Sequence, residues 1–256
     1  MTTPTVPTVY LACPTYDGRI EHDTAAAWLR HPTNGLCRVG HHGHRGSLLA
    51  FGFNDLWCQA VNLAAKGTYN RFAMLHADVC PEEQGWLDRL ERILQETGAD
   101  VVSVVVPIKD MRGLTSTAIG DREDPWRVRG RITMRELMNM PQTFRGCDYE
   151  PYPDGVLLVN TGCWMARLDR GDWQRRVHFE IRDRIVELEG GELKAQCMPE
   201  DWHFSHQLRR LGVDVVATRA VAVRHVGRME FVNNQVWGKY ERDPSWVGET
   251  DNPEEG

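Results

Sequence analysis

Two side chains that can bind a metal ion stand two positions apart at the end of a short apolar segment. The segment is residues 71–75 (RFAML), and His76 and Asp78 follow it. Because side chains alternate along an extended chain, His76 and Asp78 project to the same side. An imidazole and a carboxylate placed there can hold a divalent cation against a diphosphate. A plain turn in which Asp78 caps the following helix explains the same residues without a ligand.

A predicted strand, turn and helix position this pair. Residues 71–75 have the apolar character of a buried strand, and apolar side chains recur with helical spacing over residues 86–94. In an α/β sheet, ligands bind where the strands end. The sequence therefore predicts that His76 and Asp78 lie at the ligand-binding edge of a sheet.

Two further candidate groups occur late in the chain. Glu200 and Asp201 begin an amphipathic pattern over residues 200–211, which predicts a helix. Acidic residues also stabilise a helix N-terminus electrostatically, so this pair has a structural explanation as well. His225 stands in the apolar segment 220–226, a predicted strand, where a lone histidine is usually structural.

The order of the predicted elements indicates an α/β fold. Strands and helices alternate over the first 107 residues, which favours a parallel sheet with right-handed crossovers. The later part predicts a mixed C-terminal extension of the same sheet. We therefore expect one domain over residues 1–240, with a mostly parallel central sheet and helices on both faces. Its nucleotide-binding half would span about 8–110 and its acceptor half about 111–232, followed by an acidic, flexible tail at 241–256.

Several local patterns give more specific expectations. Strands are predicted over residues 8–13, 36–39, 101–106, 155–160 and 213–216, and helices over 22–30, 54–66 and 172–188, although apolar residues at 177–181 alternate as in a strand. Residues 41–46 predict a polar loop, and Thr133 with Glu136 predicts a capping box. Residues 111–130 are rich in Gly, Thr, Ser and Arg and predict an irregular loop, a candidate lid over the donor. The polar composition from Asn233 onward predicts disorder.

Composition excludes some classes of protein. Of 256 residues, 41% are hydrophobic and 26% charged, which is ordinary for a globular domain. No apolar run approaches the roughly 20 residues that a membrane span needs, so we expect no membrane partner and a cytoplasmic location, in the host if a phage encodes the protein. The net charge of −6 gives no general attraction to nucleic acid. Seven scattered cysteines without a CxxC pair argue against a disulfide framework or a cysteine zinc site.

Five short motifs and one histidine occur in an order that resembles the GT-A class of nucleotide-sugar glycosyltransferases. They are residues 13–16 (CPTY), the helix from Asn54, residues 76–78 (HAD), residues 160–165 (NTGCWM) and residues 199–204 (PEDWHF), followed by His225. The resemblance covers residues 8–228 and depends on the order and spacing of the motifs. It implies a Rossmann-like GT-A fold and a hexosyltransferase-type reaction that uses a nucleoside-diphosphate sugar, with a UDP-sugar as the expected donor.

The resemblance also assigns residues to the donor. Pro14, Thr15 and Tyr16 match the strand end that contacts the nucleotide base and ribose, Asn54 opens the second motif, and Asn160, Thr161 and Gly162 match the segment below the sugar and the acceptor. Lys109, or an arginine of the 112–131 segment, is expected to add positive charge near the diphosphate.

In this class an acidic DxD motif holds Mn²⁺ or Mg²⁺ against the diphosphate. Asp78 matches the last position, which is usually the direct metal ligand, whereas His76 replaces the first acid. His225 matches a late-strand histidine that supplies a further ligand in many members. A mixed set of nitrogen and oxygen ligands shifts the preference from Mg²⁺ towards Mn²⁺.

The acidic pair Glu200 and Asp201 resembles the motif that opens a helix in this class. In inverting members a carboxylate there takes the proton of the acceptor hydroxyl. In retaining members it binds hydroxyls of the donor sugar. The sequence leaves the stereochemistry open, with Asp201 and then Glu200 as the candidate catalytic residues.

Two other functions remain open, as does the acceptor. A sugar nucleotidyltransferase uses a similar sheet and metal-binding carboxylates, and nine tryptophans with a basic segment are compatible with a carbohydrate- or nucleic-acid-binding module. The acceptor of a glycosyltransferase would be a hydroxyl group. Arginines within 112–131 and 167–176 can follow phosphates, so hydroxymethylated pyrimidine in phage DNA is one hypothesis. A monomer and a homodimer are equally compatible with the sequence.

Overall fold

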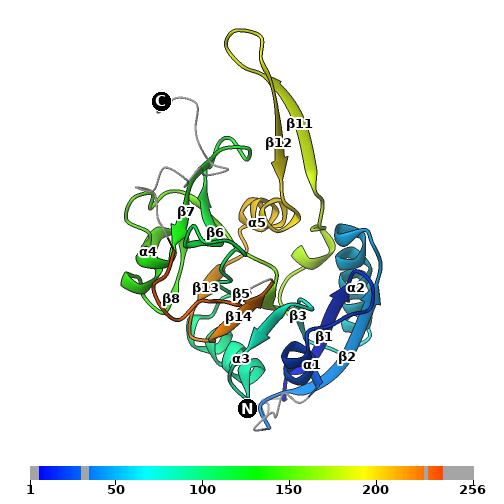
Figure 1. Cartoon of the computed structure of the whole chain (residues 1–256). Coiled ribbons are helices and arrows are strands. Elements are labelled where there is room, and N and C mark those ends of the chain that lie inside the picture. Colours follow the sequence, from blue (N-terminus) through cyan, green and yellow to red (C-terminus); the bar gives the residue numbers. More distant parts are fainter. Residues whose placement is uncertain (1–5, 30–34, 228–229, 239–256) are drawn as a thin grey trace.

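The computed structural model describes residues 6–29, 35–227 and 230–238, and its centre is a seven-stranded sheet (Figure 1). The strand order is β2-β1-β3-β10-β5-β13-β8. Five strands are parallel: β1 (Thr8–Thr15), β2 (Arg38–Arg45), β3 (Arg71–Leu75), β5 (Val101–Val104) and β13 (Val215–Thr218). The antiparallel strands are β10 (Cys163–Arg167) and β8 (Thr143–Phe144). The predicted mixed α/β class with a mostly parallel sheet is confirmed.

Helices cover both faces of the central sheet, as predicted. Helices α1 (His22–Leu29) and α3 (Trp86–Thr97) pack on one face, where Leu11 and Leu75 of the sheet meet Leu90 of α3. Helices α2 (Leu49–Ala64) and α5 (Glu200–Arg210) pack on the other, where Phe72 and Trp164 meet Phe204 of α5. Successive side chains of β1 and β3 point to opposite faces of the sheet, so each strand contributes to two separate hydrophobic layers.

Strand β10 joins the two halves of the chain into one sheet. It lies antiparallel between β3 and β5, so a strand from the second half completes the sheet of the first. It also returns residues 161–163 to the end of β3, where the His76 amide donates to the carbonyl of Gly162 at 2.8 Å. The central sheet therefore brings two of the predicted motifs side by side.

The expectation of an irregular loop over residues 111–130 is wrong. Strands β6 (Leu114–Gly120) and β7 (Val128–Thr133) form a hairpin that pairs with β9 (Val156–Leu158) in a second sheet. Ile119 and Ile132 are fully buried there, together with α4 (Met134–Asn139) and the region of the 3₁₀ turn Gly146–Asp148. The threonines of β6 are buried, and the hairpin contains β-bulges where the register shifts, so a polar and glycine-rich composition is compatible with strands here.

The predicted surface helix over residues 172–188 is also wrong. The chain forms a 3₁₀ turn (Trp173–Arg175), an extended segment and then β11 (Arg182–Glu187), which pairs with β12 (Leu193–Met198). These two strands make an arm that projects from the body (Figure 1). The four-residue spacing of apolar side chains is an even number, so it fits one face of a strand as well as a helix.

Smaller differences concern three other segments. Residues 41–46 are not a loop, because β2 continues to Arg45 at the sheet edge, where polar side chains reach solvent. Asn233 is fully buried rather than disordered and follows β15 (Glu230–Val232), which pairs with β14 (Val223–Val226) and, through it, with β4 (Val79–Pro81). The predicted tail at 241–256 lies outside the described residues. None of the helices in the described ranges is long and apolar enough to cross a bilayer.

The capping box predicted at α4 is present and gives a stability test. The Thr133 hydroxyl accepts the amide hydrogen of Glu136 at 3.1 Å, and the Glu136 carboxylate accepts that of Thr133 at 2.8 Å. Thr133→Ala should lower the free energy of unfolding by about 1 kcal/mol, the usual cost of a lost N-cap, measured by urea titration. Thr133→Ser keeps the hydroxyl and should stay near the wild type; equal losses in both variants would contradict a capping role.

Candidate functional site

The predicted metal-binding residues meet beyond the end of β3. One carboxylate oxygen of Asp78 forms an ion pair with Lys109, which follows β5. The other lies 3.7 Å from Nε2 of His225 on β14. Strand β14 reaches this place because it pairs with β4, directly after Asp78, and the Val226 amide donates to the Asp78 carbonyl at 2.8 Å. The structure thus brings Asp78, Lys109 and His225 together.

His225 is held in a form suited to metal binding. Its Nδ1 lies 2.7 Å from the carbonyl oxygen of Pro107. A carbonyl only accepts hydrogen bonds, so Nδ1 carries the ring proton and Nε2 directs a lone pair towards Asp78. Metal-binding histidines commonly have their other nitrogen anchored in this way. Burial, the largest influence, lowers the pKa of His225 and favours the neutral ring.

His76 contributes a nitrogen that is closed off from solvent. Its Nε2 is buried and has no hydrogen-bond partner among the described residues. The ring packs against Phe53, with centroids 4.9 Å apart, and burial lowers the pKa of His76 to about 4. Leaving a buried polar atom unpaired is costly, so this atom is a natural candidate for a ligand contact.

The charge state of Asp78 depends on its neighbours. Burial alone would raise the pKa of Asp78, but the hydrogen bond from Lys109 and the nearby His225 outweigh that effect and hold the pKa below its usual range. The carboxylate is therefore ionised at neutral pH and able to bind a cation.

Three hydrogen bonds connect this tip of β3 to the acidic pair of α5. The His76 amide donates to the Gly162 carbonyl at 2.8 Å, and the Gly162 amide donates to Oδ1 of Asn160 at 2.6 Å. Nδ2 of Asn160 then donates to Oδ2 of Asp201 at 3.3 Å. A Cβ on Gly162 would lie 2.6 Å from Oδ1 of Asn160 and 3.2 Å from Val79, so only glycine permits this close approach.

Asp201 lies in the buried first turn of α5, where its ionisation is costly. Its Oδ1 accepts the Trp202 amide hydrogen at 2.8 Å. Burial, and next the charge of Glu200, raise the pKa of Asp201 to about 8, and burial raises the pKa of Glu200 as well. A carboxyl group with a pKa near the working pH can both take and release a proton.

The first turn of α5 is firmly placed against the second sheet. The indole nitrogen of Trp202 donates to the Ser116 carbonyl at 3.2 Å, and the guanidinium of Arg131 lies 4.6 Å from the Trp202 ring centroid. The Ser205 hydroxyl accepts the Val159 amide hydrogen at 3.0 Å. These contacts fix the first turn of α5, which carries Asp201, to β6, to β7 and to the residue after β9.

The residues expected to contact the nucleotide lie at the ends of β1 and β10. Thr15, after Pro14, donates its hydroxyl to the His44 carbonyl at 3.0 Å, and the Tyr16 side chain is 74% exposed. An exposed ring at a strand end can stack on a planar base. The Thr161 hydroxyl is buried without a partner among the described residues. Their contacts with a donor remain predictions.

Asn54, by contrast, is engaged elsewhere. Both polar atoms of its amide bond the backbone of Phe179, at 2.7 and 2.8 Å. These bonds give the side chain a structural role in the contact between α2 and the segment before β11, and its contact with a donor stays a prediction.

The arginines that might follow nucleic-acid phosphates are largely engaged within the protein. Arg112 pairs with Asp110, Arg129 with Asp121 and Asp154, and Arg170 with Asp100, while Arg167 donates to the carbonyls of Leu94 and Ala99. Trp126, within the segment predicted as a lid, packs against the arm, where the Arg184 guanidinium lies 4.4 Å from its ring centroid. Arg122, Arg127, Arg175 and Arg176 are exposed, so the DNA acceptor stays a hypothesis. The irregular loop on which the lid hypothesis depended is replaced by a paired hairpin.

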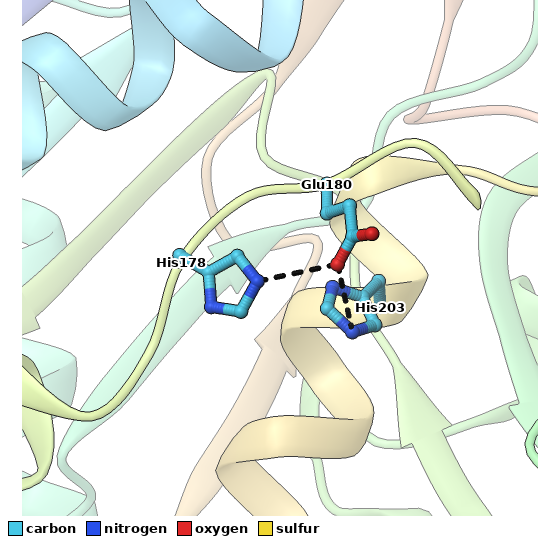
Figure 2. A group of neighbouring side chains, drawn as sticks. All are labelled: His178, Glu180 and His203. Carbon is cyan, nitrogen blue, oxygen red and sulfur yellow. Dashed lines mark hydrogen bonds and ion pairs between the residues drawn. The ribbon is translucent and has the colours of Figure 1, made fainter.

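One group of side chains was missed by the sequence analysis. Within the described ranges, His178, Glu180 and His203 are the one set of three potential metal ligands whose ligand atoms all lie within 4.8 Å of one another (Figure 2). The sequence analysis predicted a helix over 172–188, and on a helix His178 and Glu180, two residues apart, would not face each other. The alternation at 177–181 was the signal that could have found it.

Comparison with known proteins defines the class of fold and no more. No protein-family model matches the chain, and no curated protein sequence matches it significantly. The fold is GT-A-like. A197 from STIV is similar over 92% of this chain and 95% of that chain, with 13% sequence identity and a TM-score of 0.51. A CMP:2-keto-3-deoxy-manno-octonic acid synthetase solved with CTP has 10% sequence identity and matches over 85% of this chain and 91% of that chain. Its TM-score of 0.41 is too low to indicate a shared fold.

The raised pKa of Asp201 predicts a pH-dependent stability difference. The unfolded carboxyl loses its proton near pH 3.8, whereas the folded one keeps it to about pH 8. Between these values the folded state binds more protons, so ionisation of Asp201 destabilises the fold progressively as pH rises. Asp201→Asn cannot ionise. Its free energy of unfolding should exceed that of the wild type at pH 8.5, by a margin that shrinks towards pH 4; a pH-independent difference in urea titrations would contradict the raised pKa.

Proposed function

We propose that this protein is a metal-dependent glycosyltransferase, which moves a sugar from a nucleoside-diphosphate sugar to a hydroxyl acceptor. The observation that carries the proposal is the hydrogen-bonded path from His76 and Asp78 at the end of β3, through Asn160, to Asp201 at the start of α5. It connects the segment that carries Asp78 with Asp201, whose pKa is raised to about 8. The GT-A-like fold is compatible with this reaction and does not by itself decide it.

The residues present fit a divalent ion at this place. Asp78 is ionised, His225 directs a lone pair towards it, and the buried Nε2 of His76 has no partner among the described residues. Two protein ligands with the remainder from substrate phosphates and water are typical of Mg²⁺ or Mn²⁺ sites in phosphate chemistry. When bound, the ion would neutralise charge that develops on the diphosphate leaving group.

Two further groups of the chain have defined tasks in this mechanism. The acceptor oxygen forms a bond to the anomeric carbon while the bond from that carbon to the diphosphate oxygen breaks, and the electron pair leaves with the diphosphate. Asp201 takes the acceptor proton, oriented by Asn160, and a base on the acceptor side gives inversion of configuration. Lys109 supplies a positive charge beside the diphosphate once Asp78 is engaged.

The second candidate is a sugar nucleotidyltransferase, and the two reactions leave different products. The protein is incubated with a panel of nucleotide sugars, including UDP-sugars, and the products are identified by mass spectrometry. Nucleoside diphosphate should be released slowly without an acceptor and faster when a suitable hydroxyl compound is added. Release of pyrophosphate from a nucleoside triphosphate and a sugar phosphate would support the nucleotidyltransferase instead. Activity in neither assay would favour a binding module.

Metal dependence is expected to rest on Asp78. EDTA should abolish turnover, and Mn²⁺ or Mg²⁺ should restore it. Asp78→Ala should remove activity while the fold is retained, because a lost direct ligand costs several kcal/mol in the transition state. His76→Ala should only weaken activity. Full activity in EDTA, or an inactive His76→Ala beside a nearly normal Asp78→Ala, would contradict the assignment.

The proton acceptor can be tested separately from donor binding. Asp201→Asn keeps the shape and the bond from Trp202 but cannot take a proton, so transfer should slow by roughly 10²–10⁴-fold while nucleotide-sugar affinity is largely kept. Glu200→Gln should be milder. Chiral analysis of the product gives an independent check, since retention of configuration would reduce Asp201 to a binding role.

A further inference from the structure

Two side-chain amides hold the chain before β11 in an extended form. Asn54 bonds both the amide and the carbonyl of Phe179, at 2.8 and 2.7 Å. Gln207 does the same for His178, accepting from its amide at 3.2 Å and donating to its carbonyl at 2.7 Å. Each amide pairs with the backbone as a neighbouring strand would. The segment is thereby fixed to α2 and to α5 at once.

This clamp places two metal-binding side chains on the same side of the segment. Because the backbone is extended, His178 and Glu180 project together, while Phe179 between them is buried in the core. His203, two residues beyond Asp201 on α5, faces them and is almost fully buried. Figure 2 shows the three side chains directed at one point, with Glu180 between the two rings.

The distances among these three side chains suit one bound ion. Nε2 of His178 lies 3.2 Å from Oε2 of Glu180, and Nε2 of His203 lies 3.9 Å from the same oxygen. Zn²⁺ lies about 2.0–2.2 Å from such ligands, so two of them in a tetrahedral arrangement are about 3.4 Å apart. The observed separations fall on either side of this value. Small side-chain rotations would therefore complete the site.

We propose that His178, Glu180 and His203 form a second metal site, one for a first-row transition ion of the Zn²⁺ type. Two imidazoles and one carboxylate favour such ions over Mg²⁺ or Ca²⁺, which prefer oxygen ligands. Three protein ligands leave a coordination position open. It faces solvent, since the side chains of His178 and Glu180 are 57% and 48% exposed.

Binding of an ion through Nε2 of His203 requires the ring proton to lie on Nδ1, which faces the amide nitrogen of Gln207. The Gln207 amide nitrogen has one hydrogen on the His178 carbonyl, and its other hydrogen has two acceptors, Nδ1 and the carbonyl of His203, at 3.2 and 3.4 Å. When the ion binds, the second Gln207 hydrogen would point to the His203 carbonyl, because a protonated Nδ1 cannot accept it. The ion would then link the base of the β11–β12 arm to α5.

Cobalt binding to the full-length chain, with any affinity tag removed, tests this proposal. Co²⁺ in a nitrogen and oxygen site gives visible absorption bands, and Zn²⁺ displaces it. At least one equivalent should bind in the wild type, and Asp78→Ala, which removes the proposed diphosphate-metal site, should still bind one. His178→Ala and Glu180→Gln should weaken Zn²⁺ binding at least about 10-fold, since even the loss of a ligand's hydrogen-bond partner costs that much.

The control is a similar histidine that lacks a third ligand. His22 is exposed and lies 2.9 Å from the Asp23 carboxylate, so His22→Ala should bind Co²⁺ as the wild type does. The two site variants alter exposed side chains and leave the clamp intact. Unchanged binding in both of them, absence of cobalt bands in the wild type, or loss of binding in Asp78→Ala would each overturn the proposal.

Discussion

The close approach of Gly162 to Asn160 is the contact on which the arrangement of the proposed active site depends. The backbone of Gly162 takes a hydrogen bond from the end of β3 and gives one to Asn160, which in turn bonds Asp201. A side chain at position 162 would push these groups apart. Three hydrogen bonds and the absence of a Cβ at position 162 thus set the distance between the proposed metal-binding residues and Asp201.

Much of the site could be predicted from the sequence, because its parts obey local rules. The apolar strand before His76 and the amphipathic pattern after Glu200 each identify an element and the end at which polar groups gather. Parallel strands end at the same edge of a sheet, so Asp78 after β3 and Lys109 after β5 lie at one edge, although β10 separates the two strands. His225 could be placed only by resemblance, since its contact comes from the long-range pairing of β14 with β4.

The remainder could not be predicted, for reasons that are physical. A spacing of four residues fits both a strand face and a helix face, so the segment at 172–188 was ambiguous. The grouping of His178 and Glu180 with His203 could therefore not be predicted. The hairpin β6–β7 is held by pairing with β9, more than thirty residues away, and nothing in its own glycine-rich composition reveals that partner. The engagement of Asn54 with Phe179 likewise depends on contacts between distant segments.

The arm also has a mechanical consequence for α5. Only Pro199 stands between β12 and the first residue of α5, and proline has a fixed φ, so the arm and the helix form a stiff lever with the acidic pair at its joint. Trp126 braces the arm from the side through Arg184. Residues added at the far turn, beside Gly190 and Gly191, would lengthen the lever harmlessly. A residue inserted at Pro199 would loosen this joint and uncouple the arm from α5, which Phe204 and Leu208 hold in the core.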